Sequence, residues 1–175
     1  MQRTIALTLG LALLAATQAL PAQTVVPLAK LDQPRYTGTW YEIARLPTKR
    51  GKNCSGDVIQ EVAGGDKANQ LQFVNACMTK RGYLDATNAT GRSPDKSGDG
   101  KLKITTFWPF SRKYWILAIG PDYDWSLAGN PNHKELWIFS RKTTLAPEAL
   151  NTIKAQADAM GYPSAKLLMT PQTPR

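Results

Sequence analysis

The sequence predicts an all-β protein, an eight-stranded up-and-down antiparallel β-barrel with one C-terminal α-helix packed against its outside. Three observations predict this fold. Short runs rich in β-branched and aromatic residues recur about every ten to twelve residues from residue 38 onward, and clusters of turn-forming residues separate them. A single segment with helical periodicity follows the last run. The 175 residues suffice for one domain with a substantial core.

The strands are placed by the turn clusters between them. Stretches such as AGGDKAN, SPDKSGDG and GNPNH carry the Gly, Pro, Asn and Asp residues that turns require. Between them, segments such as KLKITTFW alternate only in part, as expected where both faces of a strand are covered. We expect strands over 38–46, 55–62, 70–78, 84–92, 101–107, 113–119, 123–129 and 135–141.

The last element is a helix within TTLAPEALNTIKAQADAMGY. Thr144 is the expected N-cap, Pro147 and Glu148 suit the first turn, and Gly161 is the expected stop. One face carries apolar side chains at helical spacing, so the helix should pack on the sheet. These side chains are Leu150, Ile153, Ala157 and Met160.

The amino terminus has the pattern of a secretory signal peptide over residues 1–22, which leaves a domain over 23–175. Arg3 is the positively charged start, an apolar run over 5–16 follows, and small residues at Ala19 or Ala22 mark the cleavage site. A membrane-spanning anchor needs about 18 or more apolar residues, and this run is shorter. We therefore expect an exported protein whose mature form is soluble.

Net charge indicates the class of partner, and the cysteine and histidine content indicates which covalent and metal sites the chain can form. The formal net charge of +9 indicates an anionic partner such as a lipid head group or a membrane surface, and export argues against nucleic acid. Cys54 and Cys77 are the two cysteines, and in an oxidising compartment such a pair favours a disulfide. His133 is the sole histidine, so the sequence indicates no metal site, and it indicates no cofactor.

The barrel topology also predicts which chain segments meet. If each strand pairs with the next and the first closes on the last, the end of the last strand returns to the start of the first. That places Arg141 beside Trp40, where a guanidinium over an indole face stabilises by about 0.5–2 kcal/mol. Gly38 has no side chain and therefore allows chain segments to approach one another closely at this closed end.

Three stretches of the chain resemble the three signature regions of the lipocalins and occur in the same order. They are GTWYEIARLP, GPDYDWSLAG and LWIFSR. The stretches TTFWPF and MGYPSAKLLMTPQ are similar to the bacterial outer-membrane lipocalins, the apolipoprotein D-like type. The resemblance covers residues 31–172 and implies that its signature residues close the barrel and do not contact ligand. These are Gly38, Trp40, Asp122, Tyr123 and Arg141.

The chain departs from that pattern in one respect. Many bacterial members carry a lipobox cysteine at the cleavage site, whereas the first cysteine here is Cys54. A covalent lipid anchor is therefore doubtful, and we expect a periplasmic protein associated with the outer membrane at most peripherally.

The loops expected at the opposite, open end are basic. They carry eight bases and no acid, which suits the head group of a lipid or an anionic membrane. The bases are Lys49, Arg50, Lys52, Lys80, Arg81, Arg112, Lys113 and Lys134. Trp108, Pro109 and Phe110 lie among them and suit either the membrane interface or the lip of the barrel. The residues expected at the cavity or its lip are Ala44, Asn75, Trp108, Tyr114 and Trp115.

We therefore expect a lipid-binding protein that holds a fatty acid or lysophospholipid, because an eight-stranded barrel has room for one small ligand. One alternative is an interaction or structural module whose barrel is filled by side chains and holds no lipid. A hydrolase is another, although His133 and Glu42 lack evident catalytic partners.

A transmembrane barrel is disfavoured because Lys101 and Lys103 share one strand face. The calcium-loop-like stretch 95–106 ends in Thr rather than Glu, which favours a hairpin turn. We expect the sequon at Asn88 to be unused.

Overall fold

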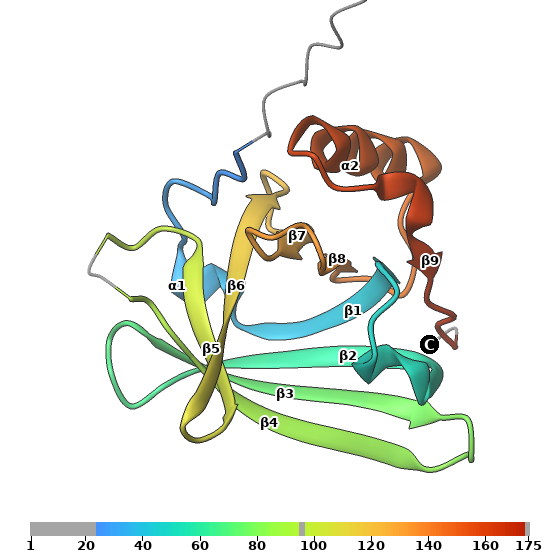
Figure 1. The fold of residues 1–175 in the computed structure, drawn as a ribbon, viewed down its shortest axis with the longest axis horizontal. Helices are drawn as coiled ribbons and strands as arrows, with labels where there is room; N and C mark the ends of the chain where they lie inside the picture. Colours follow the sequence, from blue (N-terminus) through green and yellow to red (C-terminus); the bar gives the residue numbers. More distant parts are fainter. Residues whose placement is uncertain (1–23, 95–96, 174–175) are drawn as a thin grey trace, which may run out of the picture.

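The computed structural model describes residues 24–94 and 97–173, which form a β-barrel with a long helix outside it (Figure 1). The predicted signal peptide over residues 1–22 lies outside the described residues. The strands are β1 (Gly38–Arg45), β2 (Cys54–Gly64), β3 (Gln70–Thr79), β4 (Leu84–Arg92), β5 (Lys101–Phe107), β6 (Phe110–Ile119), β7 (Trp125–Gly129), β8 (Leu136–Ser140) and β9 (Leu168–Met169). The helices are α1 (Gln33–Tyr36) and α2 (Pro147–Ala159), with single 3₁₀ turns over Arg50–Lys52 and Ser164–Lys166.

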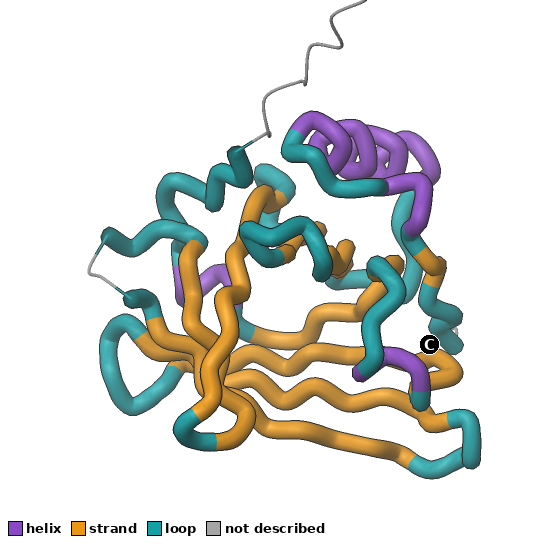
Figure 2. Tube along the Cα trace, viewed as in Figure 1, coloured by secondary structure: helices purple, strands orange, loops and turns teal. Residues whose placement is uncertain are grey.

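The eight long strands close into a ring, as the sequence predicted. Each strand from β2 to β8 pairs antiparallel with the next, and β1 pairs with both β8 and β2. Tyr41 lies opposite Ser140 on the β8 side and opposite Ile59 on the β2 side. Figure 2 shows this wall of strands, with α2 outside it. β1 therefore closes the barrel, because it lies between β2 and β8 and pairs with both.

Each face of the barrel wall has its own hydrophobic core. Inside, a cluster around Trp40, Phe73, Leu102 and Ile116 fills the closed half of the barrel. Outside, α2 buries Ile153 and Ala157 against Ile43, Leu136 and Ile138. Two cores are expected when strand side chains alternate and a helix covers one outer face. The predicted position of the helix outside the barrel is thus confirmed.

The chain before β1 covers the closed end. The amide of Leu28 donates to the carbonyl of Ile116 at 2.8 Å, and the amide of Gly100 donates to the carbonyl of Leu28 at 2.7 Å. The short helix α1 follows, with Asp32 as its N-cap. Its last residue, Tyr36, is fully buried in the inner core. The sequence analysis did not predict this segment, because four helical residues are too few for periodicity to appear.

Other boundaries also differ from prediction. α2 begins at Pro147 with Ala146 as N-cap, so Thr144 does not cap it, although Gly161 ends the helix with φ +82° as expected. β6 begins at Phe110 rather than at residue 113 because the β5–β6 turn is tight. β9, which pairs Leu168 with Arg45, was not predicted. A strand of two residues carries no alternation to detect.

One strand pair is short, and this shapes the site. β4 spans Leu84–Arg92, yet it pairs with β5 only over Thr90–Arg92. The remainder of β4 pairs with β3 alone. Residues 84–88 are exposed on both faces. The barrel wall is therefore incomplete beside the first half of β4.

Candidate ligand-binding site

The closed end is sealed by Arg141, as the barrel topology predicted. Its guanidinium lies 3.7 Å from the centre of the Trp40 ring, which is fully buried. The same group donates to the carbonyls of Arg35 and Thr37 at 2.8 Å each and of Thr39 at 2.9 Å. Burial lowers the pKa of Arg141 from its usual value. This end of the barrel is closed by contacts within the chain.

The other signature residues surround this seal. Gly38 has φ +99°, and a Cβ there would lie 3.2 Å from the Arg141 guanidinium, so glycine suits both the conformation and the space. Tyr123 lies in the β6–β7 turn with φ +58°, and its hydroxyl accepts a hydrogen bond from the Asp32 amide at 3.0 Å. Asp122 lies in the same turn and is exposed.

The open half of the barrel contains a cavity of about 180 Å³. Its apolar wall comes from several strands, because side chains alternate and every second residue faces inward. That wall consists of Val58, Phe73, Ile104, Trp137 and Phe139. The volume is below the roughly 300–1,000 Å³ of pockets that enclose a whole drug-sized molecule. The cavity therefore suits part of a ligand, such as a segment of one acyl chain.

Three polar side chains form a chain of hydrogen bonds on the cavity wall. The Tyr114 hydroxyl donates to Gln60 Oε1 at 3.3 Å, and Gln60 Nε2 donates to Asn75 Oδ1 at 2.9 Å. Tyr114 also packs on Phe73 and Trp137, with ring centres 5.9 and 5.6 Å away. Burial, then the neighbouring Tyr36, raises the pKa of Tyr114 well above its usual value. We call Gln60, Asn75 and Tyr114 the polar cluster.

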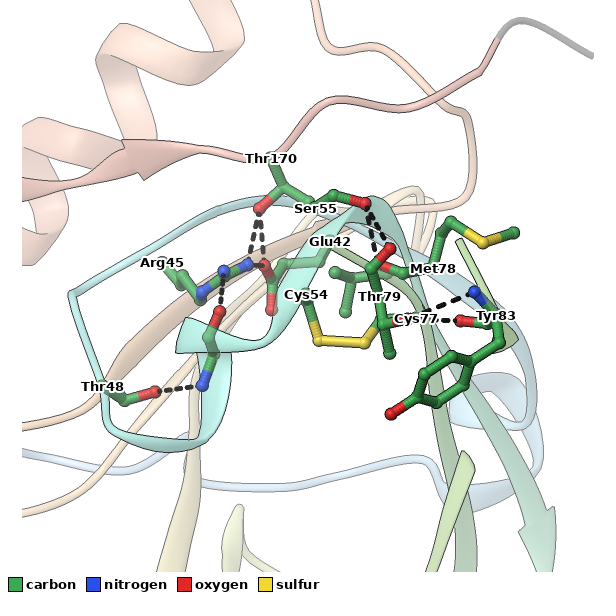
Figure 3. Close-up of a disulfide and its surroundings, with 12 residues drawn as sticks. Glu42, Arg45, Thr48, Cys54, Ser55, Cys77, Met78, Thr79, Tyr83 and Thr170 are labelled. Atoms are coloured by element: carbon green, nitrogen blue, oxygen red, sulfur yellow. Dashed lines mark hydrogen bonds and ion pairs between the residues drawn. A yellow bond between two sulfur atoms is a disulfide. The ribbon is translucent and has the colours of Figure 1, made fainter. Parts of the chain in front are cut away.

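Two ion pairs stand nearer the mouth. Glu42, only 3% exposed, accepts hydrogen bonds from Arg45 and from the Thr170 hydroxyl (Figure 3). Arg45 also donates to the carbonyl of Gly51 at 2.9 Å, which ties the β1–β2 loop over the mouth. Across the cavity, Arg112 pairs with Glu135 at 3.4 Å. The carboxylates of Glu42 and Glu135 are thus each held by an adjacent guanidinium group.

A second, shallow pocket adjoins the mouth on the outside of Arg45. It is lined by Lys49, Lys52 and Lys80, together with apolar Pro47 and Leu168. Arg45 lines both this pocket and the cavity. No acidic residue is among the pocket's described lining residues. We call Arg45, Lys49, Lys52 and Lys80 the basic rim.

The remaining predicted bases are more dispersed. Arg81 lies in the β3–β4 turn and Lys134 in the β7–β8 turn, both exposed, and Arg50 lies in the 3₁₀ turn of the β1–β2 loop. Arg112 and Lys113 lie within β6 rather than in a loop. The open end also carries an acid that the loop assignment had placed in a strand, since Glu135 precedes β8. The basic character of this end is therefore concentrated at the basic rim.

The predicted cavity residues divide into three groups. Asn75 and Tyr114 line the cavity. Ala44 and Trp115 instead belong to the outer core beneath α2. A bulge between Glu42 and Ala44 adds a residue to β1 and turns Ala44 outward. Trp115 follows the inward-facing Tyr114, and neighbours in a strand face opposite sides.

Trp108 stands apart at the β5–β6 turn. It is 82% exposed, and its neighbours Phe107 and Phe110 are 73% and 72% exposed. Pro109 follows it through a cis peptide bond. These side chains project from the barrel and do not line the cavity. They form an exposed apolar patch, which we call the aromatic tip.

The cysteines form the predicted disulfide at the cavity mouth. Cys54 and Cys77 are bonded, with Cα atoms 5.7 Å apart, and both line the cavity (Figure 3). The bond fixes the first residue of β2 against β3. Ser55 in turn donates to the carbonyls of Met78 and Thr79 at 3.0 and 3.2 Å. These contacts hold one side of the mouth rigid.

Of the residues considered for other chemistry, Glu42 lines the cavity, and the others that the structure describes do not. His133 is half-buried, and its Nε2 lies 3.0 Å from the Met160 carbonyl while its ring packs against Tyr162. Asn88 is exposed on β4. Asp95 of the calcium-like stretch lies outside the described residues, and Asp99 pairs with Lys101 at 2.8 Å. No cluster of His, Cys, Asp or Glu suited to a metal occurs among residues 24–94 and 97–173.

Several residues of the site were not predicted from the sequence. These are Gln60, Trp137 and the two ion pairs. A detectable signal existed for Gln60, which stands two residues from Val58 and from Val62 and so shares their inward face. The described part of the chain holds no helix long and apolar enough to cross a bilayer.

Comparison with known proteins agrees with this geometry. The family model for the lipocalin-like domain matches residues 31–172. Temperature-induced lipocalin-1 of Arabidopsis thaliana is 30% identical over 151 residues, covering 82% of this chain and 80% of that protein. Outer membrane lipoprotein Blc of Escherichia coli K12 is 28% identical over 169 residues, covering 87% and 85%. The structure of insecticyanin from the tobacco hornworm Manduca sexta superposes with a TM-score of 0.68 at 19% identity, covering 89% of this chain and 87% of that one. The resemblance inferred from the signature stretches is confirmed.

Proposed function

The chain belongs to the lipocalin-like domain family, whose members bind small hydrophobic molecules, and on that premise we propose that its barrel holds one fatty acid or lysophospholipid. The observation that carries this proposal is a cavity of about 180 Å³ that has an apolar wall, with a basic rim directly outside it. Each buried methylene contributes about 0.8 kcal/mol. The acyl chain would lie against Phe73, Ile104 and Phe139, and the anionic head at the basic rim.

The cellular role we propose is transport or storage of lipid in a bacterial envelope. Similarity to outer membrane lipoprotein Blc and the predicted signal peptide support an envelope location. Within the envelope, we propose a periplasmic protein that is associated with the outer membrane at most peripherally. Fractionation of cells that express the full chain tests this, and recovery of the uncleaved chain in the cytoplasm would refute export.

A peripheral contact with an anionic membrane is the second part of the proposal. The aromatic tip exposes Phe107, Trp108 and Phe110, and aromatic side chains favour the bilayer interface. Trp108→Ser with Phe110→Ser should weaken sedimentation with vesicles rich in phosphatidylglycerol. The matched control is Tyr83→Ser with Leu84→Ser, two exposed residues with large hydrophobic side chains where the β3–β4 turn meets β4. Equal sedimentation of wild type and the tip variant would refute the membrane contact.

Binding itself is tested by titration with palmitate and lysophosphatidylcholine, with tryptophan fluorescence as the readout. Trp137 lines the cavity and should report occupancy. Native mass spectrometry of the freshly purified protein checks for a lipid that copurifies. A protein that is free of lipid and binds neither titrant would refute the proposal and favour a filled interaction module.

The basic rim gives a sharper test. Replacing Lys49, Lys52 and Lys80 together with Gln should weaken palmitate binding about tenfold and reduce its dependence on salt. The control is the same change at three exposed lysines elsewhere, Lys67, Lys103 and Lys142. An equal loss in both variants would mean that net charge, and not the rim, attracts the ligand.

A further inference from the structure

The polar cluster is unusual in its position. Gln60 and Tyr114 are each only 4% exposed, and with Asn75 they line the cavity beside its apolar wall, away from the two ion pairs nearer the mouth. A saturated acyl chain has no atom that can hydrogen-bond to the amides on the cavity wall. Covering amide N–H groups with such a chain leaves them without partners, which is unfavourable. The cluster therefore requires an explanation beyond lipid binding in general.

The cluster retains unused hydrogen-bonding capacity. The two amides carry four N–H bonds, and the Gln60 to Asn75 bond uses one of them. No other described residue accepts from the remaining three. In the empty cavity water can occupy these donors. A saturated chain that reaches the cluster would displace that water and offer no acceptor in return.

We propose that the polar cluster selects acyl chains that carry an oxygen along the chain, namely hydroxy or oxo fatty acids, over saturated chains of equal length. This inference rests on the proposed function, because it requires that an acyl chain enters the cavity. A ligand hydroxyl or ketone oxygen accepts from the Gln60 or Asn75 amide. Sites that hydrogen-bond a buried ligand group reject the analogue lacking it far more strongly than apolar pockets discriminate by size.

The oxygen must be neutral, and the carboxylate must therefore stay outside. The polar cluster consists of two amides and one hydroxyl, with no charge of its own. Burial of Tyr114 disfavours negative charge there, as the direction of its pKa shift indicates. The basic rim lies at the mouth, between the β1–β2 loop and the β3–β4 turn. The ligand thus enters with its chain first, and the oxygen that the cluster recognises lies part-way along that chain.

The experiment compares palmitate with monohydroxypalmitates whose hydroxyl is moved along the chain. Wild-type protein should bind the best-placed isomer at least about tenfold more tightly than palmitate, the equivalent of about 1.4 kcal/mol. Isomers with the hydroxyl elsewhere should lose this gain, because the cluster is fixed by strands β2, β3 and β6. Isothermal titration gives the affinities directly.

Two variants connect the preference to the cluster. Asn75→Leu replaces the amide with an apolar group of similar shape, and it should bring the affinity ratio close to one while palmitate binding persists. Asn88→Leu makes the same chemical change on the exposed β4 and should leave the ratio as in wild type. Persisting palmitate binding in Asn75→Leu also shows that this variant is folded.

The outcomes separate this inference from the proposed function. Equal affinity of the wild type for palmitate and for every hydroxy isomer would overturn the inference and leave lipid binding intact. An unchanged ratio in Asn75→Leu would overturn the assignment to the polar cluster. Absence of binding to palmitate and to all isomers would overturn the proposed function, and this inference with it.

Discussion

Replacement of Arg141 with Met should destabilise the barrel more than any comparable change at its closed end. Met retains much of the apolar length of the side chain but removes the guanidinium. That group joins α1, β1 and the β6–β7 turn through bonds to the carbonyls of Arg35, Thr37, Thr39 and Tyr123. Because these segments are distant in sequence, the contacts exist only in the folded chain.

The magnitude follows from the burial of each contact. The Arg35 carbonyl is exposed and can return to water, and the Tyr123 contact is long at 3.3 Å. The bonds to Thr37 and Thr39 are part-buried, and bonds from a charged donor contribute about 1.5–3 kcal/mol each. The contact with Trp40 adds about 0.5–2 kcal/mol. Desolvation of the charge, which lowers the pKa of Arg141, offsets part of this gain. We expect a net loss of about 3 kcal/mol.

The assay is urea denaturation followed by tryptophan fluorescence, with the slope compared between variants so that a change in midpoint reports stability. Arg35→Met is the matched control, because Arg35 also lies over an aromatic ring, Tyr123 at 4.2 Å, but is exposed. It should cost about 0.5 kcal/mol. Arg141→Lys keeps the charge without the planar fork and should fall between the two. Equal losses for Arg141→Met and Arg35→Met would refute the role of burial in this reasoning.

Two further predictions concern stability. Replacing both Cys54 and Cys77 with Ala should lower the free energy of unfolding by about 3 kcal/mol, because the bond closes a separation of 23 residues; an unchanged urea midpoint under non-reducing conditions would contradict this. Burial raises the pKa values of Tyr36, Tyr114 and Tyr162 above the ordinary tyrosine value of 10.0, so the folded state binds these protons more tightly than the unfolded state. Stability is then fully present below about pH 10 and falls above it, with a slope approaching 1.4 kcal/mol per pH unit for each tyrosine. Urea midpoints measured between about pH 9 and pH 11 check this slope, and a flat profile would contradict it.

The closed end could be predicted from sequence because its contacts follow from topology alone. Once eight strands pair in order and the ring closes, the last strand must end beside the first, whatever the twist of the sheet. This is why Trp40 and Arg141 could be paired without knowing any side-chain orientation. The prediction needed only the number of strands and their order, both of which the turn clusters indicate.

The cavity could not be predicted as well, because it depends on strand phase. A shift of one residue moves a side chain from the inside to the outside of the wall. The bulge in β1 did this at Ala44, and no feature of the sequence there signals a bulge. Trp115 was assigned inward together with Tyr114, although adjacent strand residues cannot share a face. That second error was avoidable from alternation alone.

The short pairing of β4 with β5 connects the fold to the site. Because β4 meets β5 only over Thr90–Arg92, the inward-facing side chains of Asp85 and Thr87 line the cavity and are also exposed. Thr106 on β5 does the same across the interrupted pair. Water therefore reaches the cavity from this side as well as past the basic rim. The amides of buried Gln60 and half-buried Asn75 then have water to bind when no ligand is present, which explains how a stable barrel can hold these donors beside an apolar wall. A ligand that fills the cavity must replace that water, and the oxygen it brings to the cluster decides how much of the hydrogen bonding is recovered.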